Sequence, residues 1–505
     1  MRKILIGIGA AVVVLAAVGF AGTEWLRYRT EREIEATFAA MRASVGAASY
    51  GRAQFSPWTR TIRISDVAVQ ANRNGANSTR IGELVLAGVP LLPPKDRIAA
   101  RQVELTRTEI AGTGAKTVRI EGITIDDLDV SRATDWQRLR AVVEAMGGPP
   151  TSVPPPKDVL PVIAQTLEGI RFGRLEMRGL AFREGAGGVD VASVRLDGLV
   201  DGRLAELAVL GVNSVALPDK VSFGRIALKK FDLAGLLRKS ARLSAANRQP
   251  APDEIAELFA ALEAIEMEEV VIPDQRLRAS NGVIHVVAAQ LSWGQFVGIM
   301  PTTARYAVKA EMPLADELGD LAQSLRAAGR KSLLVGFDMT TTWTERTRTL
   351  LLSPATFELD TLFSVGLKLS IDNFSPDLMT NDRFKTPLAI ASLEIGAVEL
   401  SLYDSGGLDL VAADAAKKMA ISTSAARTKL ASDMKLNARM QPQQSPEFER
   451  LVDGFGRFLA GEGSTLTIKL TPKGRVNVMQ TLELAKLDPI SVLSQFTVEA
   501  LVGGR

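Results

Sequence analysis

The strongest constraint on the fold is a five-residue pattern, apolar-x-apolar-x-x, that recurs along the chain. A regular strand alternates with a period of two, so one extra residue after each apolar pair sends the next pair to the opposite face. A β-bulge or a tight bend at each x-x step restores the original face. The copies are Ile62/Ile64/Val67/Val69, Val118/Ile120/Ile123/Ile125/Leu128/Val130, Ile170/Phe172/Leu175/Met177/Leu180/Phe182, Val221/Phe223/Ile226/Leu228/Phe231/Leu233, Ile265/Met267/Val270/Ile272 and Leu388/Ile390/Leu393/Ile395/Val398/Leu400/Leu402.

Glycines occupy several of the x-x steps, where their freedom of backbone angle favours a bulge. They are Gly122, Gly173, Gly179, Gly224 and Gly396. The first five copies begin at residues 62, 118, 170, 221 and 265, a loose repeat of about 50 residues that is typical of an elongated array. The alternative is that any β-rich chain produces such apolar pairs by chance.

Later segments alternate without the extra residue. Tyr306, Val308, Ala310 and Met312 share one parity, as do Phe363, Val365, Leu367, Leu369 and Ile371. This alternation predicts antiparallel strands with one buried and one wet face. Helices are short, such as one over 448–459 that Gly461 would end. The predicted fold is mainly β with short helices: an N-terminal transmembrane helix, then an elongated, curved, largely antiparallel sheet built from loosely repeated bent strands.

The N-terminus carries a membrane-length apolar segment. Residues 4–22 are uncharged and follow Arg2 and Lys3, and they would span about 28 Å as a helix. We predict a retained anchor; the alternative is a signal peptide cleaved at the small-x-small site formed by Gly19 and Ala21. The predicted organisation is an anchor at 1–23, a juxtamembrane helix at 24–48, a repeat region at 49–250 and an antiparallel region with helices at 251–505.

Composition excludes several classes of site. The 505 residues contain no Cys and one His, which excludes disulfides, Cys-ligated zinc, iron–sulfur clusters and thiol nucleophiles. His285 lies in a predicted strand and is interpreted as structural. The net charge of +3 comes from mixed charges, unlike the concentrated basic surface of a nucleic-acid binder. We predict no catalytic, cofactor or metal site; a hydrolase using two carboxylates stays an alternative because it needs no local motif.

One charge feature is a candidate binding patch for lipid headgroups or a partner. Seven basic residues and one acid lie between Arg225 and Arg248, and eight acids without a base follow from Asp253 to Asp274. The alternative is that the two runs pair with each other, as surface charges often do. The candidate residues are Arg225, Lys229, Lys230, Arg238, Lys239 and Arg242, with the aromatic residues Phe172, Phe223 and Phe231.

Three of the bent-strand runs, Ile170–Leu180, Val221–Leu233 and Leu393–Leu400, resemble those of the AsmA-like and YdgA-like envelope proteins of Gram-negative bacteria. The resemblance implies a single-pass anchor in the bacterial inner membrane with the bulk of the chain in the periplasm. It further implies a non-enzymatic role in envelope lipid transport or outer-membrane homeostasis through an apolar β-groove. Phospholipid and other envelope proteins would be its partners. The alternative is a membrane-tethered scaffold with a closed β core.

Overall fold

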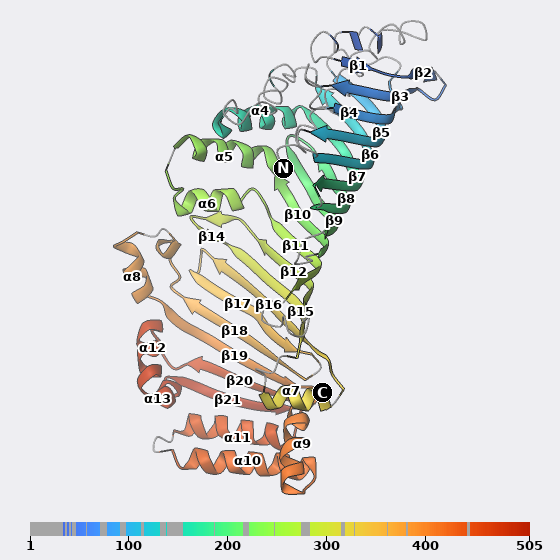
Figure 1. Ribbon diagram of the computed structural model, residues 1–505. Coiled ribbons are helices and arrows are strands. Elements are labelled where there is room, and N and C mark those ends of the chain that lie inside the picture. The colour runs from blue at the N-terminus through green and yellow to red at the C-terminus, as the bar shows by residue number, and fades with distance from the viewer. Residues whose placement is uncertain are drawn as a thin grey trace. The chain divides into compact units, whose positions relative to one another are not determined.

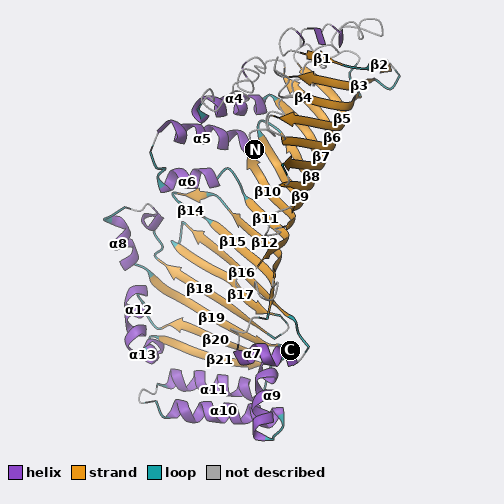
Figure 2. Cartoon of the chain, in the orientation of Figure 1, coloured by secondary structure: helices purple, strands orange, loops and turns teal. Residues whose placement is uncertain are grey.

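The chain is mainly β, with antiparallel sheets and a few short helices, in a computed structural model (Figures 1 and 2). This coarse fold prediction is confirmed. The predicted anchor at 1–23 lies outside the described residues, and the juxtamembrane helix at 24–48 lies largely outside them. The structure describes residues 34–35, 38–39, 42, 47–56, 58–70, 78–90, 97–112, 116–131, 138, 155–185, 187–215, 222–246, 248–273, 283–314, 319–327, 329–360, 362–379, 382–441 and 445–504.

Within those described ranges, no helix is both long enough and apolar enough to cross a bilayer. The chain divides into two compact units, Met1–Val270 and Val271–Arg505. The sequence places a boundary at residue 250, whereas the division in the structure falls within a strand twenty residues later.

The N-terminal unit is an antiparallel sheet in which each long strand pairs with the next along the chain (Figure 1). The short strands β1 and β2 both pair with β3. The strands are β1 (Ala47–Ser49), β2 (Arg52–Ser56), β3 (Thr61–Gln70), β4 (Ser78–Ala87), β5 (Arg97–Gly112), β6 (Lys116–Ser131), β7 (Ile170–Glu184), β8 (Gly187–Leu199), β9 (Arg203–Val215), β10 (Ser222–Asp232) and β11 (Ala264–Pro273), which begins in this unit.

Paired bulges cross this sheet in two rows. In the first row, each strand from β3 to β10 leaves one residue out of the pairing register: Asp66, Gly82, Arg107, Glu121, Gly179, Ala192, Gly211 and Gly224. Every second one of them, on β3, β5, β7 and β9, has a positive φ. A second row includes Asp127, Gly198 and Lys230, also with positive φ. The bulges predicted at the x-x steps are confirmed at Asp66, Asp127, Gly179 and Lys230, and they keep the apolar residues on one face.

The glycines at these steps have two different roles. Gly179 itself adopts the positive φ. Gly173 and Gly224 do not; they lie opposite the positive-φ residues Asp127 and Glu269, and a Cβ on Gly224 would lie 2.6 Å from the Glu269 Cβ. The prediction that all these glycines supply unusual backbone angles is therefore wrong for Gly122, Gly173, Gly224 and Gly396. At position 224 glycine is favoured because the bulge of the neighbouring strand brings Glu269 too close for a Cβ.

The apolar face of the N-terminal unit is closed over β3 to β6 and half-buried over β8 to β10. Ile64, Leu84, Val103 and Leu105 have almost no exposed surface and belong to one buried cluster that extends from β1 to β10. The helices α4 (Pro156–Glu168), α5 (Leu233–Ala246) and α6 (Pro252–Phe259) lie together at one end of the strands (Figure 1). Their Leu167 and Leu236 pack against the same cluster.

The C-terminal unit is a second antiparallel meander. The sheet strands pair in chain order and are β12 (Val283–Trp293), β15 (Thr303–Pro313), β16 (Ser332–Thr344), β17 (Thr349–Leu359), β18 (Phe363–Asp372), β19 (Glu394–Asp404), β20 (Thr465–Pro472) and β21 (Phe496–Gly503). A small hairpin joins β13 (Phe296–Val297) to β14 (Met300–Pro301). Figure 2 shows how the helices gather around the ends of these strands.

The helices of this unit lie at both strand ends. They are α7 (Gly319–Ala327), α8 (Lys385–Ala391), α9 (Gly407–Met419), α10 (Thr423–Arg439), α11 (Pro446–Ala460), α12 (Val478–Leu487) and α13 (Pro489–Leu493), with a 3₁₀ turn, η4 (Pro376–Met379). The predicted end of α11 is confirmed, because Gly461 follows it with φ 86°. One strand prediction is wrong: Leu388 and Ile390 lie in α8, and only the residues from Glu394 onward form β19. The apolar spacing there reflects side chains on the surface of a short helix.

Candidate functional site

A continuous apolar face crosses the sheet of the C-terminal unit. Residues that are directly opposite in register form one row from β12 to β21: Leu291, Tyr306, Met339, Ala355, Leu367, Leu400, Ile468 and Ala500. The neighbouring row is Ala289, Val308, Phe337, Phe357, Val365, Leu402, Leu466 and Val502. The Tyr306 and Phe337 rings lie 5.8 Å apart between their centroids, which links the two rows.

The part of this face on β12, β15, β16, β17 and β18 is open. Tyr306 is 43% exposed and Phe357 is 39% exposed, and Val308, Phe337 and Val365 between them are only half-buried. Core side chains of these types are normally almost fully buried. We call this part of the two rows the open face: Leu291, Tyr306, Met339, Ala355, Leu367, Ala289, Val308, Phe337, Phe357 and Val365.

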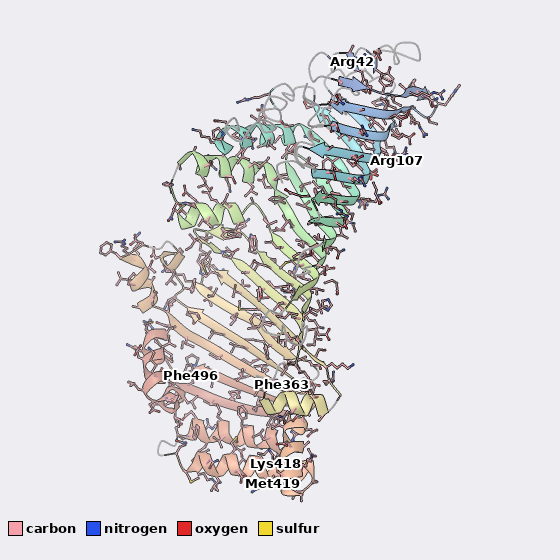
Figure 3. All side chains as sticks on the ribbon, in the orientation of Figure 1. Arg42, Arg107, Phe363, Lys418, Met419 and Phe496 are labelled. Atoms are coloured by element: carbon pink, nitrogen blue, oxygen red, sulfur yellow. The ribbon has the colours of Figure 1, made fainter. Side chains whose placement is uncertain are left out.

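The same rows are closed where they reach β20 and β21. Ile468 is 4% exposed, and Leu466 and Val498 are buried beneath α11. Phe458, Phe455 and Leu451 of α11 complete this buried cluster. Gly454 allows the close approach, because a Cβ there would lie 2.5 Å from the Ala500 Cβ. Figure 3 labels two phenylalanines of this unit, the exposed Phe363 of β18 and the buried Phe496 of β21.

Both ends of the open face are closed by packed residues. At one end, Leu325 of α7 packs with Leu314, Leu333 and Leu359. At the other end, Trp293 and Trp343 are buried, and the Trp343 indole N–H donates to the Phe374 carbonyl oxygen at 3.0 Å. In the described part of the chain, the buried clusters of this unit do not include any residue of the open face. The strands therefore present an apolar surface between two closed ends.

The opposite face of the same strands is polar. Arg305 and Asp338 form a two-pronged ion pair across β15 and β16, with N···O distances of 3.2 and 2.7 Å. Lys368 of β18 pairs with Glu399 of β19 at 2.9 Å. This alternation was predicted from the sequence, but the prediction placed the apolar face in a buried position. Exposure depends on what covers a face, so the alternation alone could not reveal the open face.

The basic run in the N-terminal unit is paired with carboxylates. Arg225 lies 2.7 Å from Glu206 on β9, and 3.1 and 2.8 Å from Glu266 and Glu268 on β11. Lys229 contacts both Glu206 and Glu266. The pairing of the basic run with the acidic run, which the sequence left open, is thus present in the structure. It neutralises much of the positive charge that a headgroup patch would need.

The remaining basic candidates are distributed over β10 and α5. Lys230 pairs with Glu263 at 2.7 Å, Arg238 pairs with Glu168 of α4, and Lys239 donates to the Glu257 carbonyl oxygen at 2.8 Å. Arg242 is exposed on α5. These contacts join α5 to α4 and α6, and β10 to the segment before β11. Anion binding by this run stays a prediction, and the geometry gives each paired cation a structural role.

Electrostatics inside this cluster follow from its geometry. The hydrogen bond to Glu206 holds the pKa of Arg225 above its usual value, so the guanidinium is permanently charged. Burial acts to raise the pKa of Glu206, but the hydrogen bonds from Lys229 and Arg225 outweigh it, and the pKa of this carboxyl is lowered. The cluster is therefore a set of charged groups that satisfy each other.

The aromatic candidates are separated from this charge. Phe172 and Phe231 belong to the buried core of the N-terminal unit, and Phe223 is half-buried on β10. A buried phenylalanine packs against its neighbours and is not accessible to a ligand in solution. The structure therefore does not bring the predicted aromatic and basic residues together into one site.

The residues with metal or acid–base potential have structural partners. The His285 Nδ1 lies 3.9 Å from Glu311, its cross-strand neighbour. Asp129 accepts a hydrogen bond from Arg97 at 3.0 Å, and Asp127 adopts the positive φ of a bulge. Across the described residues, no three His, Cys, Asp or Glu side chains gather where they could hold a metal ion.

Comparison with known proteins gives one match. Residues 356–501, which extend from β17 to β21, match a family described as "Uncharacterized protein". No curated protein matches the chain. The matched segment contains the closed part of the apolar face and one border of the open face.

Proposed function

We propose that this chain is a non-enzymatic, membrane-anchored envelope protein that holds the acyl chains of phospholipids on the open face of its C-terminal unit. Residues 4–22 would anchor it in the bacterial inner membrane with both units in the periplasm. Through this elongated β-groove the protein would support lipid transport or outer-membrane homeostasis. The observation that supports this proposal is the half-buried aromatic and aliphatic surface around Tyr306, Phe337 and Phe357.

The energetic argument is one of hydrophobic burial. Contiguous exposed apolar surface is rare on a soluble protein and marks a binding surface. Each methylene of an acyl chain that leaves water contributes about 0.8 kcal/mol. The open face is also flanked by closed ends at Leu325 and at Trp293. These ends favour a bound chain that lies across the strands over a flat, extended protein interface.

The second candidate function is a membrane-tethered scaffold with a closed core. The buried cluster of the N-terminal unit supports it, because Ile64, Leu84 and Val103 have no exposed surface and form a closed core. The two candidates differ in what contacts the open face. A scaffold leaves that face free of lipid, whereas a lipid-holding protein places acyl chains against it.

Site-specific crosslinking tests the proposal. A photoreactive phenylalanine analogue replaces Phe357 on the open face or Leu351 on the polar face of the same strand. The two native side chains are similarly exposed, at 39% and 43%. Since a membrane anchor itself retains lipid, the position of the crosslink is the readout, measured by mass spectrometry of the full chain after irradiation in cells. We expect phospholipid adducts at 357 and not at 351.

Polar substitutions on the open face give the matching loss-of-function test, again read out by crosslinking. Phe357→Asn combined with Val308→Asn should reduce the phospholipid crosslinked at a neighbouring open-face position such as Phe337. Leu351→Asn should leave that yield unchanged, because its side chain lies on the other face. Equal adducts at 357 and 351, or no lipid adduct at either position, would instead support the scaffold.

A further inference from the structure

A second apolar surface of the C-terminal unit projects from one end of its strands. Phe384, just before α8, is 84% exposed; Leu388 in α8 is 73% exposed; and Leu487 at the end of α12 is 86% exposed. Leu482 and Met479 of α12 are also exposed. We call these five side chains, on α8 and α12, the apolar tip. Large apolar side chains cost free energy when they face water, so their exposure on two neighbouring helices indicates a contact surface.

The two helices of the apolar tip are joined by hydrogen bonds to backbone carbonyl oxygens. The Asn477 side-chain amide donates to the Ala391 carbonyl oxygen at 2.6 Å, and the Val478 N–H donates to the Leu393 carbonyl oxygen at 3.0 Å. Asp382 accepts from the Phe384 and Lys385 N–H groups at the start of α8. These bonds fix where the helices begin and end. The exposed side chains are therefore displayed by an ordered structure.

Positive charge borders the apolar tip. Arg383 and Lys385 flank Phe384 in the sequence, and both are exposed. The Arg475 side chain is 90% exposed and lies 3.9 Å from Glu394, and Lys486, adjacent to Leu487, pairs with Glu483 at 2.8 Å. Phe and Leu side chains together with Lys and Arg are the composition with which interfacial helices enter the headgroup region of a bilayer. Anionic headgroups would attract Arg383 and Lys385.

We propose that the apolar tip docks on a lipid bilayer, with Phe384, Leu388 and Leu487 inserted between the headgroups. Figure 1 shows α8 and α12 at the end of the strands opposite α7, so the tip lies beside the Trp293 and Trp343 end of the open face. The inference rests on the proposed function, because the bilayer that the tip contacts would be the source or the acceptor of the acyl chains on that face.

Fluorescence at a single labelled site tests this docking in the full chain. The protein has no native Cys, so Phe384→Cys can be labelled with an environment-sensitive dye without competing thiols. The labelled chain is mixed with vesicles of phosphatidylethanolamine and phosphatidylglycerol that contain a nitroxide lipid. We expect a blue shift of the dye and quenching by the nitroxide. The same dye at Leu351→Cys on the polar face should show neither change.

Substitutions in the apolar tip test whether the blue shift and the quenching depend on its side chains. With the dye at position 384, Leu388→Ser combined with Leu487→Ser should abolish the blue shift and the quenching, and both native side chains are too exposed for their loss to unfold the unit. A dye at 384 that stays water-exposed with vesicles overturns the inference. A blue shift that requires high protein concentration and no vesicles overturns it too, and assigns the tip to contact between copies of the chain.

The two proposals can fail separately. Lipid adducts at 357 without insertion at 384 would overturn docking of the apolar tip and leave the proposed function standing. Insertion at 384 without lipid adducts at 357 would overturn the proposed function and leave the membrane contact standing.

Discussion

Gly211 of β9 lies so close to Ala192 of β8 that a methyl group on Gly211 would lie 2.7 Å from the Ala192 Cβ. Both residues are left out of the pairing register between their strands, and Gly211 has a φ of 61°. Two bulges thus meet at one point of the ladder. The positive φ and the close contact both require glycine at position 211, whereas either requirement alone would be less strict.

We expect Gly211→Ala to lower the free energy of unfolding by about 2–4 kcal/mol. About 1 kcal/mol is the cost of the left-handed backbone for alanine, and the rest is the cost of overpacking. Gly185→Ala is the matched control, because Gly185 has the same φ of 61° but no atom within 4 Å of an added Cβ. It should lose about 1 kcal/mol. Urea unfolding measures both, and equal losses would show that the contact with Ala192 has no energetic weight.

The closed and open apolar faces predict an unusual order of mutational effects. Leu84→Ala removes a side chain with no exposed surface and should cost about 3 kcal/mol. Phe357→Ala removes a larger side chain from the open face and should cost about 1 kcal/mol, because much of its surface is already in water. Denaturant unfolding of the two variants in detergent-free buffer provides the comparison. A larger loss for Phe357→Ala would mean that the open face is covered.

The charge cluster around Glu206 should make stability depend on pH. The pKa of Glu206 is lowered in the folded chain because the Lys229 and Arg225 hydrogen bonds outweigh its burial. A carboxyl with a lowered pKa contributes stability above its unfolded value of about 4.5 and loses it as the pH falls through the lower folded value. The wild type should therefore exceed Glu206→Gln in unfolding free energy at pH 7, and the difference should shrink below pH 4.

The control for that experiment is Glu257→Gln. The Glu257 carboxylate is more than half exposed and lies 3.9 Å from Lys239, so its loss should change the unfolding free energy little at either pH. A Glu206→Gln difference that stays constant from pH 7 to pH 3 would contradict the assigned role of the carboxylate.

Arg427 should be essential for the helices at the end of the C-terminal unit. Its Nε donates to the Leu459 carbonyl oxygen at 2.9 Å, and its Nη1 lies 2.8 Å from Asp409 and 3.6 Å from the buried Asp404. We expect Arg427→Ala to cost about 3 kcal/mol, because it leaves Asp404 buried and without this cation. Arg427→Lys should restore little, since an ammonium cannot reach these groups at once. Lys429→Ala, at an exposed pair with Asp433, is the control and should cost less than 1 kcal/mol.

Periodicity predicted the strands and their bulges because both are local properties of the sequence. Asp127 and Lys230 could be assigned to bulges from their spacing alone. The partner of each bulge lies on another strand, so the reason for Gly224 could be seen only once β10 was paired with β11. Leu388 and Ile390 fitted the strand pattern equally well, but in the structure Asp382 accepts from the Phe384 and Lys385 N–H groups at the start of a helix.

The candidate site was also predictable only in part from the sequence. The acidic run after Arg248 pointed to partners for the basic run, and Glu263 and Glu266 are among them. An apolar groove was expected from the resemblance, but its position on β12 and β15 to β18 was not predicted, because Tyr306 and Ile468 share one row and one pattern although α11 covers only the second. Hydropathy shows which side chains are apolar, but it does not show which of them another element of the fold buries.

The pairing order of the N-terminal unit has a consequence for how the chain folds. From β3 to β10 every strand pairs with the strand before it, so most contacts close short loops. Such local pairing favours fast folding and allows growth from one end. A chain that emerges N-terminus first can therefore add each strand to a finished edge. Each new strand covers the edge left by the strand before it and so shortens the time for which that edge is exposed to aggregation.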